Sequence, residues 1–272
     1  KTQDYILIEV NPRVSRSSAL ASKATGVPIA RIAAMLCLGH KIHELPNRVT
    51  GNTSAAFEPS IDYVITKIPR WPFDKFKLAD RELGTQMKST GETMSIGRTF
   101  EESLMKAWRS IGQGEGYPEC LDWNESKLKK NLKVPNDQRL HVIWTYLKNK
   151  GATQEGINEV CNITDFHAFF IERIAKLVRL EIKVESCKDT IPDKLLIELK
   201  RNGFGDKHIS HLTRISQKEI REQRKKLGII SSFLMVDTCA GEFEAKTPYF
   251  YSTYADKKEP IKTGKSIVIL GS

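Results

Sequence analysis

The sequence predicts a mixed α/β segment followed by an irregular all-α domain. Two patterns indicate this fold class. Short β-branched runs occur near the start of the chain, and over residues 124–228 apolar residues recur at the three- and four-residue spacing of amphipathic helices. The composition, with 40% hydrophobic and 28% charged residues, is that of a globular protein and excludes collagen and intrinsic disorder.

The α/β segment is expected to alternate strands with short helices. Its strands are β-branched runs. Its first two helices have glycine just past the end, and the second of them also opens at Pro28, the asymmetry expected of helix ends. Thr99 is a suitable N-cap for the last of these helices, with Glu101 and Glu102 in the first turn. The expected elements are a strand over 5–10, a helix over 17–25 ended by Gly26, a helix over 29–38 ended by Gly39, a strand over 61–68 stopped by Pro69, an extended segment over 91–98 and a helix over 100–111.

A boundary is expected in the glycine-rich stretch 112–118. This stretch follows a helix and not a strand, and Tyr117 stands where a dinucleotide-binding G-x-G-x-x-G would need glycine, so it is interpreted as a linker. Helices are then predicted over 126–132, 139–150, 153–160, 165–185, 192–202, 206–212 and 217–227. The apolar stripe of the longest consists of Phe169, Phe170, Ile174, Leu177, Val178 and Leu180.

After Gly228 the chain is expected to be extended again, over 229–230, 233–237 and 248–254. A lysine-rich connector over 256–265 precedes a last apolar run that ends at Gly271. That run has the pattern of the first strand of an α/β nucleotide-binding unit. Because the chain also lacks an initiator methionine, we expect it to be the central slice of a longer protein.

Charge and cysteine usage limit the surroundings of the protein. Lys and Arg number 43 against 33 Asp and Glu, a net charge of +10 that fits either a solvated basic surface or a nucleic-acid partner. The charges are interspersed, which favours the solvated surface and no nucleic acid. Five cysteines without a C-x-x-C pair fit a reducing, cytoplasmic compartment. No run of 18 apolar residues is present, so no membrane contact is expected.

The sharpest candidate site follows the first predicted strand. Glu9, Asn11 and Arg13 share one face of that strand, because alternate residues of a strand point the same way. A carboxylate beside an amide oxygen suits Mg²⁺ bound with nucleotide phosphates, and Arg13 with Arg16 offers planar cations for phosphate oxygens. This combination suits phosphoryl transfer. A salt bridge between Glu9 and an arginine explains the same spacing equally well.

Other motifs have simpler explanations. Ser17 and Ser18 open a helix whose backbone N–H groups could hold an anion, although ordinary N-capping is favoured. The His-x-x-His pairs at 40–43 and 208–211 lack a third ligand and are expected to be surface histidines. Cys239 is expected to be buried, and the basic stretch 214–226 to be a solvated helix face.

The segment Glu9-Val-Asn-Pro-Arg-Val-Ser-Arg-Ser-Ser-Ala-Leu-Ala-Ser-Lys-Ala-Thr-Gly26 closely resembles the ATP-grasp signature of the carbamoyl-phosphate synthase large chain. Further segments that match in the family's order are Phe57-Glu-Pro-Ser-Ile-Asp-Tyr63, Thr66-Lys-Ile-Pro-Arg70, Met87 to Thr99, Leu199 to Phe204, Val236-Asp-Thr-Cys239 and Tyr251-Ser-Thr-Tyr254. The first segment is very specific, whereas the helical ones are diffuse.

The resemblance implies an organisation into three parts. Residues 1–112 would be the C-terminal part of the carboxyphosphate-forming ATP-grasp domain, and residues 113–258 a mainly helical oligomerisation domain. Residues 259–272 would be a linker and the first strand of the second synthetase half. The fold class is then an α/β part of an ATP-grasp domain followed by an irregular all-α oligomerisation domain.

The resemblance also implies a reaction. Such enzymes phosphorylate bicarbonate with ATP, convert the carboxyphosphate with ammonia into carbamate, and use a second ATP to make carbamoyl phosphate for pyrimidine and arginine biosynthesis. Implied cofactors are ATP, Mg²⁺ or Mn²⁺, and K⁺ as a further candidate. Implied partners are a glutamine amidotransferase small subunit or fused domain, and a second copy that associates through the helical domain.

Carried over by position, the family's roles fall on the same first segment. Glu9 and Asn11 correspond to metal ligands, and Arg13 and Arg16 to groups that hold the transferred phosphoryl and the carboxyphosphate. Ser17 and Ser18 would lie beside that site. The nucleotide-covering loop would precede Lys1, so the piece alone is expected to be inactive. An alternative from another class is a non-catalytic helical interaction module.

Overall fold

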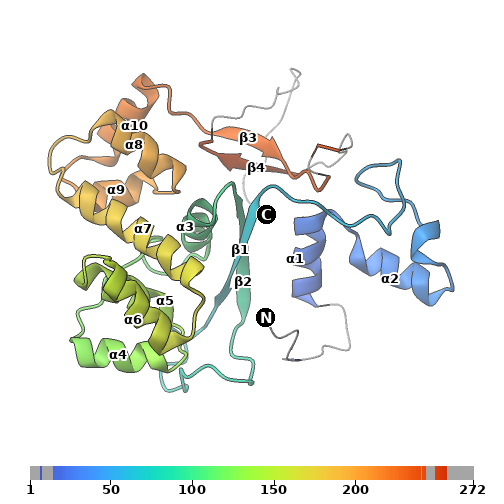
Figure 1. The fold of residues 1–272 in the computed structure, drawn as a ribbon, viewed down its shortest axis with the longest axis horizontal. Helices are drawn as coiled ribbons and strands as arrows, with labels where there is room; N and C mark the ends of the chain where they lie inside the picture. The colour runs from blue at the N-terminus through green and yellow to red at the C-terminus, as the bar shows by residue number, and fades with distance from the viewer. Residues whose placement is uncertain (1–6, 8–14, 240, 243–248, 256–272) are drawn as a thin grey trace.

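The computed structural model describes residues 7, 15–239, 241–242 and 249–255, and for Arg16 and Ser17 the backbone only. Figure 1 shows a helical lobe joined through α3 to two small sheets, with α1 and α2 beyond the sheets. The described elements, in chain order, are α1 (Arg16–Thr25), α2 (Ile29–Cys37), the 3₁₀ turn η1 (Ile42–Glu44), β1 (Val64–Arg70), β2 (Gly91–Gly97), α3 (Phe100–Ser110), α4 (Glu125–Lys133), α5 (Arg139–Asn149), α6 (Gln154–Thr164), α7 (Ala168–Glu185), α8 (Asp193–Arg201), α9 (Asp206–Leu212), α10 (Gln217–Lys226), β3 (Ser232–Met235) and β4 (Phe250–Thr253).

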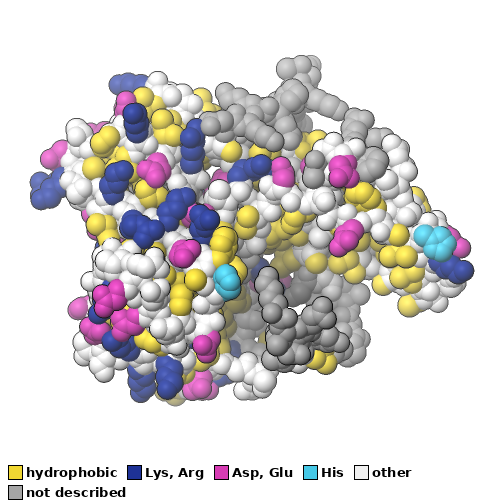
Figure 2. All heavy atoms as spheres, viewed as in Figure 1, with side chains coloured by type: hydrophobic (Ala, Val, Ile, Leu, Met, Phe, Trp, Pro, Cys, Tyr) yellow, Lys and Arg dark blue, Asp and Glu magenta, His cyan; other side chains and the backbone are white. Residues whose placement is uncertain are grey.

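The first two helices end as their glycines predict. Gly26 follows α1 with φ 70°, and Gly39 follows α2 with φ 96°, both in the left-handed region that glycine adopts without strain. α2 is apolar, yet none of its residues is buried, and Figure 2 shows hydrophobic side chains gathered over this end of the molecule. The strand expected over 5–10 and the last strand, over 266–271, lie outside the described residues.

Within the described ranges no single helix is long and apolar enough to cross a membrane. The pair formed by residues 18–25 and 29–37, bent by 109°, passes the same length and composition criteria when its two helices are taken together.

β1 and β2 form an antiparallel ribbon whose register runs from Val64 opposite Gly97 to Arg70 opposite Gly91. The strand expected over 61–68 is therefore shifted, and the expectation that Pro69 would stop it is wrong: Pro69 lies inside β1, opposite Glu92. A two-stranded ribbon consists only of edge strands, and proline is tolerated on an edge because its missing N–H removes no ladder bond there.

α3 lies across this ribbon and also contacts α7 of the helical lobe. Thr99 caps the helix by accepting a hydrogen bond from the Glu102 backbone N at 3.2 Å, as the sequence predicts. The close approach depends on Gly97, because a Cβ there would lie 2.8 Å from the Ser103 backbone N. Ser95 Oγ donates to the Ser103 carbonyl at 2.5 Å and fastens the helix to β2.

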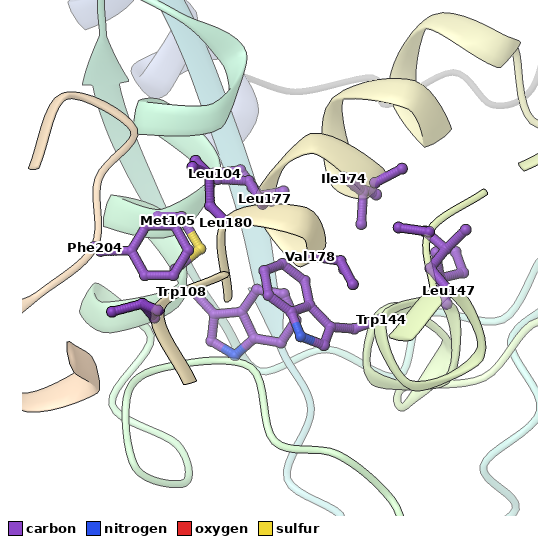
Figure 3. Packing of buried hydrophobic residues seen from close by; sticks show 14 of the residues in the cluster. Leu104, Met105, Trp108, Trp144, Leu147, Ile174, Leu177, Val178, Leu180 and Phe204 are labelled. Carbon is purple, nitrogen blue, oxygen red and sulfur yellow. The ribbon is translucent and has the colours of Figure 1, made fainter. Parts of the chain in front are cut away.

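The helices over 125–226 share one apolar core, to which α3 contributes Leu104, Met105 and Trp108 (Figure 3). The Trp108 and Trp144 rings meet edge to face with centroids 6.0 Å apart. The seven helices predicted over 126–227 are confirmed as α4–α10, with two boundaries wrong. α6 extends to Thr164 and not only to 160, and α7 begins at Ala168 and not at 165, because Asp165 adopts φ 56° and caps the end of α6.

The predicted stripe of α7 is correct only in part. Ile174, Leu177, Val178 and Leu180 are buried, but Phe169 and Phe170 are exposed at the start of the helix. Their rings contact Phe100 with centroid separations of 6.3 and 5.5 Å. Periodicity places them on the stripe, whereas in the structure they pack on Phe100 and stay partly open to solvent.

A second, smaller core joins the two sheets. β3 and β4 pair antiparallel, with Ser232 opposite Thr253. Tyr63, Leu234, Val236 and Tyr251 are buried together there, and Ile65 and Ile96 of the first ribbon pack against them. The extended chain predicted after Gly228 therefore returns to the ribbon from which the helical lobe departs (Figure 1).

Candidate functional site

The predicted site residues lie at and before the start of α1. Glu9, Asn11 and Arg13 lie outside the described residues. Arg16 and Ser17 occupy the first two positions of α1, and their side chains also lie outside what the structure describes. Of the predicted set, the structure therefore places only the side chain of Ser18.

Ser18 takes part in the capping of α1. Its backbone N donates to Ser15 Oγ at 3.3 Å, and the Ser15 backbone N donates to Ser18 Oγ at 3.4 Å, so the two serines form a capping box. The helix begins at Arg16, one residue earlier than expected, because Ser15 is the N-cap. N-capping, the simpler explanation of the serine pair, is thus present at Ser18, and a role in anion binding stays a prediction.

The other end of α1 is fastened to the rest of the molecule. The Tyr63 hydroxyl donates to the Ala24 carbonyl at 2.6 Å. Gly26 packs closely against Val49 and Thr238, and no side chain would fit there. An added Cβ would lie 2.5 Å from Val49 Cγ2 and 3.4 Å from Thr238 Oγ1. The position of α1 is therefore set by contacts from three distant stretches of the chain.

Asp62 and Arg98 support this anchor from the sheet side. Arg98 Nη1 donates to Asp62 Oδ2 at 2.6 Å, and Tyr63 packs against Tyr251 with ring centroids 5.8 Å apart. Burial raises the pKa of the Tyr251 hydroxyl, opposed by the neighbouring Arg98 cation. Burial likewise raises the pKa of Tyr63, whose neutral hydroxyl is the donor to the Ala24 carbonyl.

Glu102 links the same cluster to α3 and β4. Its Oε2 accepts from the Arg98 backbone N at 2.8 Å and from Thr253 Oγ1 at 3.1 Å. This carboxylate is almost fully buried. From the sequence, Glu102 could be placed only in the first turn of a helix. Its contact with Thr253 could not be predicted, because the two residues are 151 positions apart in the chain.

Asp237 shapes the segment that contacts Gly26. Its carboxylate accepts from the backbone N–H groups of Cys239, at 2.8 Å, and Gly241, at 3.1 Å. The Ser60 backbone N donates to the Thr238 carbonyl at 2.9 Å, which ties 57–63 to 236–239. Cys239 is buried, as expected. Four of the segments that carry the resemblance therefore meet near the C-terminal end of α1, which is called the base of α1 below. They are 57–63, 87–99, 236–239 and 251–254.

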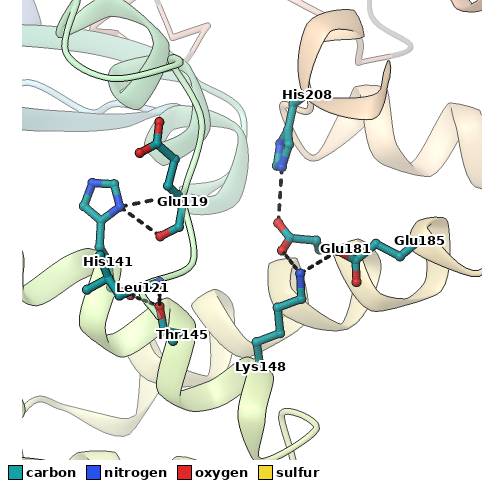
Figure 4. Close-up of polar contacts among 8 residues, drawn as sticks. All are labelled: Glu119, Leu121, His141, Thr145, Lys148, Glu181, Glu185 and His208. Atoms are coloured by element: carbon teal, nitrogen blue, oxygen red, sulfur yellow. Dashed lines mark hydrogen bonds and ion pairs between the residues drawn. The ribbon is translucent and has the colours of Figure 1, made fainter. Parts of the chain in front are cut away.

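A separate polar cluster lies inside the helical lobe (Figure 4). Lys148 Nζ contacts Glu181 Oε1 and Glu185 Oε1, each at 2.6 Å, and His208 Nε2 lies 3.2 Å from Glu181 Oε2. Burial tends to raise the pKa of Glu181, but the neighbouring His208 and the hydrogen bond from Lys148 outweigh it and lower the pKa. The cluster thus holds an ionised carboxylate away from solvent.

The expectation of a surface histidine is wrong for His208, which is 2% exposed. Its ring is stacked between Tyr117, at 4.6 Å, and Phe204, at 5.0 Å between centroids. Burial lowers the pKa of His208. His211, His40 and His43 are exposed, as expected. In the described part of the chain, no three His, Cys, Asp or Glu side chains are grouped as they would be around a metal ion.

Two hollows adjoin α3. One of about 610 Å³ lies between β1, α3 and α5 and is bordered mainly by apolar side chains. The other, of about 320 Å³, lies between α3, the turn joining α8 to α9, and the end of β4, and is bordered by cations. Neither includes the predicted site residues.

Family models match two parts of the chain. Residues 92–228 match "Carbamoyl-phosphate synthetase large chain, oligomerisation domain", and residues 1–45 match "Carbamoyl-phosphate synthase L chain, ATP binding domain". The first match covers the helical lobe, and the second covers the predicted site together with α1 and α2. The chain belongs to the carbamoyl-phosphate synthase large chain family.

Individual relatives agree. The chain is 49% identical over 274 residues to the carbamoyl phosphate synthase large chain of Methanosarcina barkeri, covering 100% of this chain and 25% of that protein. It is 47% identical over 277 residues to that of Thermomicrobium roseum, covering 99% of this chain and 25% of the relative. A relative from Methanopyrus kandleri, the N-terminal section of a large chain, is 46% identical over 278 residues, covering 96% of this chain and 49% of that protein. The chain thus spans between a quarter and half of these relatives.

Proposed function

We propose that this chain is the part of a carbamoyl-phosphate synthase large chain in which the ATP-grasp domain that forms carboxyphosphate meets the helical oligomerisation domain. The observation that carries the proposal is the convergence at the base of α1. Segments 57–63, 236–239 and 251–254 hold the end of the helix whose beginning carries Arg16, Ser17 and Ser18. A helix fixed in this way suits a site that must position phosphate oxygens within a fraction of an ångström.

The first reaction step is phosphoryl transfer. A bicarbonate oxygen attacks the γ-phosphorus of ATP, the bond to the β–γ bridging oxygen breaks, and carboxyphosphate and ADP result. Arg13 and Arg16 would hold the transferred phosphoryl and the carboxyphosphate, because guanidinium forks match phosphate oxygens and stay charged. Ser17 and Ser18 would border the site. Ammonia then displaces phosphate to give carbamate, which a second ATP phosphorylates elsewhere in the protein.

Glu9 and Asn11 would hold the divalent cation. A carboxylate and an amide oxygen are hard ligands that fit Mg²⁺ or Mn²⁺ and leave positions for nucleotide oxygens. When bound, the ion neutralises charge that develops on the phosphates. K⁺ is a further candidate ion in this proposal.

The partners and location follow from the same assignment. A glutamine amidotransferase subunit or fused domain would supply ammonia, and a second copy would associate through the helical lobe. We place the enzyme in the cytoplasm, in the pathways that make pyrimidines and arginine. Because the chain spans only part of its relatives, the activity is proposed for the full-length protein, and the 272 residues alone are expected to be inactive.

The test uses the full-length synthetase and bicarbonate-dependent ATP hydrolysis. Glu9→Gln and Arg13→Ala should each lower turnover by roughly two orders of magnitude or more, since each removes a group that stabilises charge in the transition state. Matched controls are Glu155→Gln and Arg221→Ala, which remove the same groups from exposed positions on α6 and α10.

Turnover by Glu9→Gln and Arg13→Ala equal to that of their controls would refute the site assignment. The alternative, a non-catalytic helical interaction module, has its own support in the continuous buried core of the helical lobe. It predicts that all four variants keep the oligomeric state of the parent protein while none affects ATP hydrolysis.

A further inference from the structure

The smaller of the two hollows next to α3 is bordered by an unusual number of cations. It has a volume of about 320 Å³ and is built from three stretches that are distant in sequence. α3 provides Lys106 and Arg109, and the α8–α9 turn provides Lys200 and Lys207. The end of β4, from Ser252 to Tyr254, closes the third side.

The charges around this hollow do not balance. Asp206 is shared by Lys200 Nζ, at 2.7 Å, and Arg224 Nε, at 3.0 Å. Lys207 Nζ is paired with Glu115 Oε2 at 2.6 Å. The nearby cations are Lys106, Arg109, Lys200, Lys207 and Arg224, and the nearby carboxylates are Glu102, Glu115 and Asp206. Five cations against three carboxylates leave an excess of two positive charges.

Lys106 and Arg109 are the two cations of this group that are paired with carbonyl oxygens and with no carboxylate of the described residues. Lys106 Nζ donates to two carbonyl oxygens, of Ile96 at 2.5 Å and Ser252 at 2.6 Å. Arg109 Nη1 donates to the carbonyl of Gly203. In the part of the chain that the structure describes, no carboxylate lies at ion-pair distance from either cation, and Glu102 is occupied by Arg98 and Thr253 instead.

Lys106 and Arg109 both border the hollow, and each has N–H donors that these carbonyl oxygens do not occupy. An ammonium has three N–H donors and a guanidinium has five, of which two and one, respectively, are used by these carbonyls. Arg109 is exposed to solvent, whereas Lys200, which also borders the hollow, is only 4% exposed. Burial lowers the pKa of Lys106, and the nearby charge of Glu102 opposes this shift.

We propose that this hollow is a binding site for a doubly charged phosphate, either inorganic phosphate or a phosphate monoester. A dianion matches the excess of two charges, and the Arg109 fork can take two of its oxygens while the remaining Lys106 N–H takes a third. The site involves none of the residues assigned to carboxyphosphate formation, so it stands or falls independently of the proposed function.

The experiment is isothermal titration calorimetry of the 272-residue chain with inorganic phosphate, followed by phenyl phosphate. Arg109→Gln should weaken phosphate binding by at least about tenfold, because one charge-assisted hydrogen-bonding partner is lost. Arg109→Lys, which keeps the charge but not the fork, should fall between Arg109→Gln and the parent chain. The control is Lys133→Gln, which removes an exposed cation from α4. Figure 1 shows α4 at the opposite end of the helical lobe from α8 and α10.

Amide NMR spectra locate the response and report folding of each variant. In the parent chain, phosphate should shift the amides of Gly205 and Ser252, which border the hollow. Tighter binding of phenyl phosphate assigns the site to esters, and equal or tighter binding of inorganic phosphate assigns it to the free ion. The proposal is wrong if neither anion binds, if folded Arg109→Gln binds as well as the control, or if the full-length protein binds neither because an acidic side chain of its own fills the hollow.

Discussion

Gly26 offers a sharp test of how α1 is held. A methyl group at this position meets two obstacles: the backbone φ of 70°, which disfavours any L side chain, and Val49 Cγ2 at 2.5 Å from the added Cβ. Gly39 follows α2 with a similar φ of 96° but has nothing within 4 Å of the corresponding Cβ. The pair therefore separates the backbone cost from the packing cost.

The expected magnitudes follow from these two situations. Gly39→Ala should cost about 1–2 kcal/mol, the penalty for placing an L residue in the left-handed region. Gly26→Ala should carry the same penalty plus about 1–3 kcal/mol for overpacking, because Val49 is itself buried and has little room to move. The difference between the two variants is thus about 1–3 kcal/mol.

Native-state hydrogen exchange of the α1 and α2 amides measures each cost as a local opening free energy. In the Gly26→Ala background, the further change Val49→Ala should restore part of the loss by making room for the methyl group. If Gly26→Ala costs no more than Gly39→Ala, or if Val49→Ala restores nothing, then Gly26 does not fix the position of α1 by close packing.

Three other outcomes are expected for the 272-residue chain. Because burial lowers the pKa of His208, the unfolded chain binds a proton below about pH 6.5 that the folded chain does not bind. The free energy of unfolding should therefore fall as the pH falls, with a contribution from His208 of up to about 1.4 kcal/mol per pH unit. In His208→Gln this dependence on pH should be weaker. Leu177→Ala should lower the free energy of unfolding in urea by about 2–5 kcal/mol. Ser15→Ala, which removes the cap of α1, should cost about 1 kcal/mol in the exchange of α1 amides.

The first two of these outcomes have controls. The pKa of His141 is also lowered by burial, so His208→Gln should keep part of the pH slope, and an unchanged slope would contradict the assignment. Ile182→Ala, at a position 36% exposed on the same helix as Leu177, should cost within about 0.5 kcal/mol. An equal loss in both α7 variants would mean that the helical core is not packed as described.

Local features of the fold could be predicted from the sequence because their causes are local. Thr99 caps α3 with its side chain, and Gly26 and Gly39 end α1 and α2 with a positive φ. The helices that they bound were predicted to within a few residues. The existence of the α4–α10 helices followed from the spacing of apolar residues, which the shared core confirms.

Features that depend on distant contacts were beyond such reasoning. Apolar spacing predicts the helix that carries His208 but does not mark this polar side chain as buried. The ring is covered by Phe204 and by Tyr117, which comes from a loop 91 positions earlier. Pro69 is allowed within β1 only because the sheet has two strands. For the site, the motif around Glu9 could be assigned from its sequence, but the Asp62–Arg98 support could not, since its members are 36 residues apart.

The contacts between the two small sheets show how the helical lobe is connected to the rest of the chain. The chain leaves β2 at Gly97 and returns at Phe250, and Glu102 bonds Thr253 across the gap. Departure and return points that touch are the mark of an insertion, tolerated where the parent fold needs only a short link. The helical lobe is therefore a long excursion of the chain between β2 and β4. It shares its core with α3, through Leu104, Met105 and Trp108, so a change in that core would also reach the ribbon that supports α1.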